Sequence, residues 1–199
     1  MWIRASPTGR TRRAVASLIA ASAAIALAGG LAGQATAATS DAEVTISAGS
    51  LSLSTPNFQA QSATLTGTAQ SIAATPASPW NAIDARGTGA AWSVVASASD
   101  LVSTGTPDRT IASANLAITT GTVTAGAGAD AVSGMTTATA APFTAPTGAG
   151  QTNVSVLAAA GPHRGSYTFT PQLGITIPAD ALASYAGSPY TTTLTVTIS

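Results

Sequence analysis

Few residues of this chain could carry acid–base, nucleophilic or metal chemistry. Its 199 residues include one histidine, His163, and no cysteine. His163 lies in a Gly-Pro-His-Arg-Gly sequence, which is typical of a turn. A Ser-His-Asp hydrolase would need a presented serine, and the Gly-x-Ser-x-Gly motif that often presents one does not occur in the sequence. We therefore predict that His163 lies in an exposed loop without a catalytic role.

The carboxylates are scattered rather than clustered. Most of the seven acidic residues stand in expected turns, where aspartate caps the backbone with its own side chain. Calcium loops need several oxygen ligands at close spacing, and disulfides and zinc–thiolate sites need cysteine. We predict no enzymatic activity, no cofactor and no metal. The rival prediction, a glycosidase, would depend on Asp84 and Asp180.

Residues of opposite charge stand close together at two places in the sequence. Asp84 stands two residues before Arg86, and Asp108 directly precedes Arg109. We expect both to be local surface pairs, each contributing about 0–1 kcal/mol to stability.

The aromatic residues have two open interpretations. Trp80 and Trp92 either fill a core that has few other large side chains, or offer a flat face to a sugar ring or wall polymer. Tyr185 and Tyr190 are further candidates for such a face.

Residues 1–37 have the pattern of a secretory leader. Four arginines in the first thirteen residues precede an alanine-rich apolar stretch, and Ala35-Thr36-Ala37 fits a small-residue cleavage site. We expect the leader to be removed and residues 38–199 to form one exported domain without a membrane anchor.

The charge of residues 38–199 excludes two classes of partner. Three arginines stand against seven acidic residues and there is no lysine, which gives a net charge of −4. Such a surface cannot neutralise a run of phosphates, so we expect neither nucleic acid nor an anionic membrane surface as a partner.

The elements expected to position these residues are short strands. Alternating apolar and polar residues separated by glycine and proline predict strands over 44–46, 51–53, 63–66, 111–118, 153–157, 167–170, 174–178 and 190–199. Residues 121–150 are expected to form small edge strands or a long mobile loop, and to be the least ordered part. No stretch after the leader has helical periodicity. The predicted fold is all-β, a single antiparallel β-sandwich of immunoglobulin-like type.

The stretch from Trp80 to Leu101 is predicted to be a β-hairpin. Its Gly87-Thr88-Gly89 centre suits a tight reversal, and the residues on either side alternate. If the turn is centred near Thr88, the two strands place Trp80, Ala82 and Asp84 on the same face as Trp92, Val94 and Ala96.

Two segments together resemble the WxL domain. The first is Asp84-Ala-Arg-Gly-Thr-Gly-Ala-Ala-Trp92-Ser-Val94, and the second runs from Ile175 through Tyr190-Thr-Thr-Thr-Leu-Thr-Val196-Thr-Ile198. That family is held non-covalently to peptidoglycan on Gram-positive cell surfaces. This chain departs from the family pattern, because valine stands for leucine at position 94, and Val196 and Ile198 replace the second Trp and Leu.

The resemblance implies a secreted cell-surface protein that binds non-covalently to peptidoglycan, another wall polymer or partner surface proteins. It implies Trp92, Val94, Asp84, Arg86, Tyr190 and Val196 as candidate binding residues. The alternative is a structural, self-associating surface protein of pilin or adhesin type without wall affinity, in which edge strands pair between molecules.

Overall fold

The structure is a computed structural model that describes residues 43–59, 61–144 and 153–199. The predicted leader, residues 1–37, lies outside the described residues. Every strand described below belongs to one compact unit, Thr45–Ser199.

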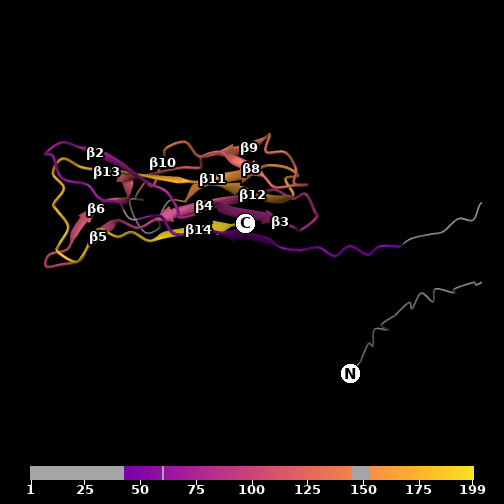
Figure 1. Cartoon of the computed structure of the whole chain (residues 1–199), viewed down its shortest axis with the longest axis horizontal. Helices are drawn as coiled ribbons and strands as arrows, with labels where there is room; N and C mark the ends of the chain where they lie inside the picture. Colours follow the sequence, from indigo (N-terminus) through magenta and orange to yellow (C-terminus); the bar gives the residue numbers. More distant parts are fainter. Residues whose placement is uncertain (1–42, 60, 145–152) are drawn as a thin grey trace, which may run out of the picture. The chain divides into compact units, whose positions relative to one another are not determined.

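The described strands form three four-stranded antiparallel sheets and a small two-stranded one (Figure 1). The first sheet has the order β1 (Leu51–Ser54), β3 (Trp80–Asp84), β12 (Gly165–Phe169), β8 (Val123–Ala125). The second has the order β10 (Ala141–Pro142), β7 (Leu116–Thr119), β13 (Gln172–Ile177), β2 (Gln70–Ala74). The third has the order β14 (Leu194–Ile198), β4 (Trp92–Ala98), β11 (Val154–Ala159), β9 (Met135–Thr137).

The two-stranded sheet pairs β5 (Leu101–Ser103) with β6 (Arg109–Ile111), and the described residues hold only one short helix, η1 (Ser113–Asn115). The predicted all-β, antiparallel, sandwich-like class is confirmed.

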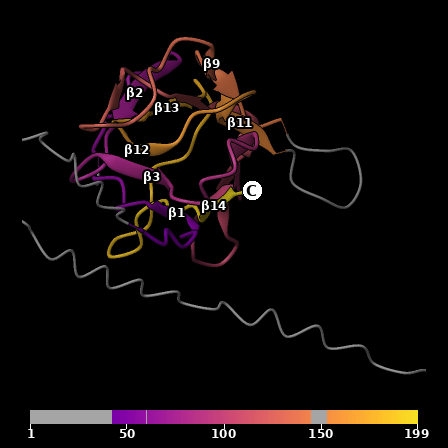
Figure 2. The ribbon, with the colours of Figure 1, turned by 90° about the vertical axis from the view of Figure 1, so that its right-hand side faces the viewer.

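Buried Thr120 ties the second and third sheets together. Its backbone N–H donates to the Ala138 carbonyl at 3.0 Å, and its Oγ1 accepts the Ala138 N–H at 2.8 Å and donates to the Val156 carbonyl. These hydrogen bonds lie where the chain crosses between the two sheets: residues 135–142 contribute β9 to the third sheet and then β10 to the second. The view in Figure 2 shows the strands arranged around a common interior.

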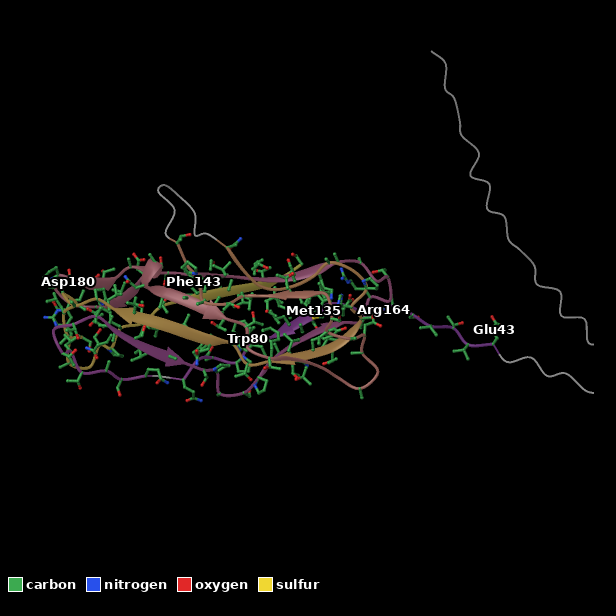
Figure 3. All side chains as sticks on the ribbon, turned by 90° about the horizontal axis from the view of Figure 1, so that it is seen from above. Glu43, Trp80, Met135, Phe143, Arg164 and Asp180 are labelled. Atoms are coloured by element: carbon green, nitrogen blue, oxygen red, sulfur yellow. The ribbon has the colours of Figure 1, made fainter. Side chains whose placement is uncertain are left out.

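That interior is filled by inward-facing aromatic and aliphatic side chains. The Trp80 ring makes edge contacts with Phe58 and Phe169 at centroid distances of 5.9 Å, and Trp92 lies 5.8 Å from Tyr167. Figure 3 shows Trp80 and Phe143 within the unit. Because Trp80 and Trp92 are 1% and 3% exposed, the interpretation of both tryptophans as core residues is confirmed.

The predicted Trp80–Leu101 hairpin is wrong. β3 pairs with β1 and β12, whereas β4 pairs with β14 and β11 in another sheet. The connecting residues 85–91 cross between sheets, with Gly87 and Gly89 at positive φ values of 70° and 67°. The prediction that the apolar residues of both strands face inward is nevertheless correct. Their burial requires only that β3 and β4 line the same interior, not that they pair with each other.

Two predicted strands, 44–46 and 63–66, are not strands, since alternation alone does not supply a partner strand. The strand predicted over 111–118 is not continuous, because η1 separates the end of β6 from the start of β7. Of the two alternatives for residues 121–150, edge strands describe the part that the structure covers, because β8, β9 and β10 each lie at the edge of a sheet. Residues 145–150 lie outside the described chain.

Gly121 occupies a position that no other residue fits. Its φ is +76°, and a Cβ there would lie 2.5 Å from the Thr170 carbonyl oxygen. Gly128 has a similar φ of +77° but open space around it. In chemical denaturation we expect Gly128→Ala to cost only the left-handed backbone term of about 1–2 kcal/mol, and Gly121→Ala to cost clearly more. Equal losses would contradict the close approach.

Candidate functional site

The six candidate binding residues divide into a buried and a part-exposed group. Trp92, Val94 and Asp84 are 3%, 0% and 2% exposed, so none of them offers a surface that a polymer could contact directly. Arg86, Tyr190 and Val196 are partly exposed.

The two segments that carry the family resemblance lie on paired strands. β4 and β14 run antiparallel with Val94 opposite Ile198 and Ala96 opposite Val196. Ser93 and Ser199 exchange backbone hydrogen bonds of 2.8 and 3.0 Å. Segments about one hundred residues apart thus form one ladder, a relation that no local pattern predicted.

Asp84 and Arg86 hold the loop that follows β3. Arg86 Nε and Nη2 donate to the two Asp84 carboxylate oxygens at 2.9 and 3.0 Å, and Nη2 also donates to the Ala90 carbonyl at 2.9 Å. The Asp84 side chain is 0% exposed, so the expected surface pair is wrong at this position: the carboxylate is buried. The Arg86 hydrogen bonds hold the pKa of Asp84 below its usual value, against the opposing effect of burial.

A second group of contacts fixes the same end of the unit. Trp92 Nε1 donates to the His163 carbonyl at 2.9 Å, and Tyr167 Oη donates to the Asp130 and Arg164 carbonyls at 3.0 Å. Burial is the main cause that raises the pKa of Tyr167. The contacts show that Trp92 anchors the loops rather than facing a ligand.

Two further findings at this end were missed or mispredicted from the sequence. His163 is 8% exposed, with its ring nitrogens 3.2 and 3.0 Å from the Gly161 and Ser133 carbonyl oxygens, so the predicted exposed histidine is wrong. Arg164 pairs with Asp130 at 3.0 Å and lowers the pKa of that carboxyl. Neither partner could be found by sequence spacing, since the chain must fold to bring them together.

The two candidate tyrosines at the other end are held by contacts within the unit. The Arg109 guanidinium carbon lies 3.8 Å from the centroid of the Tyr185 ring, and the ring edge lies against Gly105. Asp108 caps the turn by accepting the Gly105 N–H at 2.8 Å, so no Asp108–Arg109 pair forms, contrary to expectation. Tyr190 Oη donates to the Leu182 carbonyl at 3.0 Å.

The carboxylates of the rival glycosidase prediction are not brought together. Asp84 pairs with Gly165 in the ladder of β3 and β12, so it lies close to Arg164. Figure 3 shows Arg164 at one end of the unit and Asp180 at the other, so Asp84 and Asp180 are far apart. Within the described residues, no group of three or more potential metal ligands occurs, and no helix is long and apolar enough to cross a membrane.

A groove of about 460 Å³ lies between the segment that follows β1 and the segment that leads into β14. Its apolar floor comes from Phe58, Trp80, Leu173, Leu194 and Val196. Its remaining lining residues are uncharged: Thr55, Pro56, Asn57, Thr192 and Thr193. Sequence reasoning singled out Val196 and Trp80 but not the groove, because its walls come from distant segments.

The groove runs along the outer edge of β14. The backbone groups of Thr193 and Ser199 hydrogen-bond to Ser99 and Ser93, at the two ends of β4. Because backbone groups alternate in direction along an antiparallel strand, the N–H and C=O groups of Leu194 and Val196 point away from β4. Among the described strands, β14 pairs only with β4, although β1 passes beside it (Figure 2). The backbone groups that Leu194 and Val196 turn away from β4 therefore pair with no described strand, and they lie beside the apolar floor of the groove.

Comparison of the chain with protein-family models, with curated proteins and with solved structures finds no match. The resemblance to the WxL domain therefore stays a prediction.

Proposed function

We propose that this chain is a secreted cell-surface protein that acts by non-covalent binding, and that the groove beside β14 is its binding surface. The observation that supports this is a strand edge with no paired strand among the described residues, next to an uncharged groove with an apolar floor. An extended chain laid along Leu194 and Val196 would pair its backbone with β14 and place alternate side chains on Phe58 and Leu173. The partner favoured by this geometry is an extended segment of another surface protein.

Peptidoglycan is the second candidate partner, favoured by the polar side chains of the groove. Hydroxyl and amide groups of Thr55, Asn57, Thr192 and Thr193 stand near the aromatic rings of Phe58 and Trp80. Such uncharged donors and acceptors beside apolar surface suit a neutral glycan or a short wall peptide.

The proposal is tested by placing a charge on each wall of the groove. Asn57 and Thr193 are both exposed, so the Asn57→Arg/Thr193→Arg double variant should fold while setting two cations over the apolar floor. We expect its retention on isolated cell envelopes, and on insoluble peptidoglycan if that is the ligand, to fall at least tenfold.

The matched control is Thr122→Arg/Thr124→Arg, which adds the same charge at exposed positions on and beside edge strand β8. It should be retained like the parent. Equal retention of both double variants, with circular dichroism showing both folded, would contradict the assignment of the groove. No retention of the parent on any envelope fraction would contradict cell-surface binding itself.

A further inference from the structure

The groove has a complementary segment within the same sequence. Residues 43–50 are all exposed, and Val44 and Ile46 are 79% and 90% exposed, although Val44-Thr45-Ile46 is β-branched at every position. Such residues favour a pleated strand with one apolar face. A strand-forming segment without a partner strand thus occurs in a chain that also has a strand edge without a partner.

From these two features we infer that residues 43–48 of one molecule occupy the groove of a second copy and add a strand to β14. The inference rests on the proposed function, since it names the partner that the groove would take.

Length and chemistry fit this occupant. Six extended residues span roughly 20 Å and the groove-lining residues 192–196 roughly 16 Å, at about 3.3 Å per residue. Val44 and Ile46 share one face of an extended chain, so both side chains reach the floor formed by Phe58, Leu173 and Val196. The groove lining is uncharged, and so are residues 44–48, which leaves Glu43, at the first position of the segment, as its one charged residue.

The same molecule's segment is poorly placed to enter its own groove. Gly49 donates its N–H to the Ala85 carbonyl at 2.8 Å, and a Cβ on Gly49 would lie 2.7 Å from the Ala85 Cβ. Residue 49 is therefore held where β1 begins, whereas the groove follows the other end of β1, at residues 55–58. To enter the groove of its own molecule, the segment would have to reverse direction before residue 49 and run back along the whole of β1.

Donation in trans uses two different surfaces, which makes the contact heterologous. Each copy then carries one strand to give and one groove to fill, so association continues head to tail unless the rotation closes a ring. The expected products are open chains of copies or closed rings, of which a two-fold dimer that exchanges both segments is the smallest.

Because the sequence has no cysteine, the contact can be measured by introducing one cysteine into each copy and observing the disulfide between them. We would produce the chain with its own N-terminal residues in a secreting host and read the mature N-terminus by mass spectrometry. Chains carrying Thr45→Cys would then be mixed with chains carrying Thr193→Cys or, to scan the register, Thr195→Cys. Both groove-side positions are exposed, and Thr45 leaves the two apolar anchors in place.

We expect a mixed disulfide between position 45 and position 193 or 195 at least tenfold above that with Thr124→Cys, an exposed threonine on edge strand β8. Adding Val44→Asp and Ile46→Asp to the Thr45→Cys chain should reduce it to the control level. Equal yield at position 124, insensitivity to the aspartates, or no mixed disulfide would overturn the inference. The proposed function would stand in that case if the groove arginines still abolished envelope retention, and would fall if they did not.

Discussion

Replacing Trp92 with alanine should lower the free energy of unfolding by about 3–5 kcal/mol, the range for deleting a large buried aromatic side chain. Trp92 is 3% exposed, packs on Tyr167, and donates its indole N–H to the His163 carbonyl at 2.9 Å. Alanine would leave a cavity and an unpaired buried carbonyl. Urea denaturation followed by circular dichroism measures the loss.

The Trp92→Phe variant separates packing from the hydrogen bond. Phenylalanine keeps most of the apolar surface but cannot donate to His163, so we expect a smaller loss of about 1–3 kcal/mol. Because the side chain anchors loops rather than facing a ligand, folded Trp92→Phe protein should be retained on envelopes like the parent. Loss of retention with unchanged stability would mean that Trp92 contacts the ligand directly.

Replacing Arg86 with glutamine should destabilise the protein strongly at neutral pH and much less below about pH 4. The substitution leaves the buried Asp84 carboxylate without its guanidinium partner. We expect a neutral-pH loss of at least half that of Trp92→Ala, measured as the shift in urea midpoint across a pH series.

The sign of the pH dependence follows from the pKa of Asp84. In the parent it is lowered by Arg86, so the pair's contribution is fully present above the unfolded value of about 4 and is lost as the pH falls through the folded value. Without the Arg86 guanidinium, burial would be the largest influence left on that pKa and acts to raise it, so protonation would relieve the penalty as the pH falls.

The matched control removes the charge as well. Asp84→Asn/Arg86→Gln keeps a polar pair of similar shape without a buried charge, so its neutral-pH stability should exceed that of Arg86→Gln alone. If the single variant were as stable as the double at pH 7, the Asp84 carboxylate would not depend on its partner.

The sequence predicted what depends on local pattern. Alternation and turn residues identified the all-β class, the strand at residues 51–53 and the inward faces of β3 and β4. Each of these follows from which side chains prefer burial and which residues reverse the chain.

What the sequence could not predict is set by contacts between distant residues. Local pattern predicted that Trp80–Leu101 forms one hairpin. In the structure β3 instead pairs with β12 and β4 with β14, some eighty to one hundred residues further along the chain. His163 is buried because the fold places distant residues such as Ser133 and Tyr167 beside its ring. Among the candidate binding residues, burial removes Trp92, Val94 and Asp84 as direct contacts, and Val196 alone lines the groove.

The most direct test of the central claim is residue-resolved amide hydrogen exchange along β14. In dilute, unbound protein the amides of Leu194 and Val196 should exchange fast, because they face away from β4. The amide of Thr197, which alternation directs toward Val95 of β4, should exchange slowly. When the protein associates at higher concentration or binds soluble peptidoglycan fragments, we predict that exchange at Leu194 and Val196 slows at least tenfold while that of the Trp92 amide is unchanged. Binding or association with no slowing at Leu194 and Val196 would contradict the account.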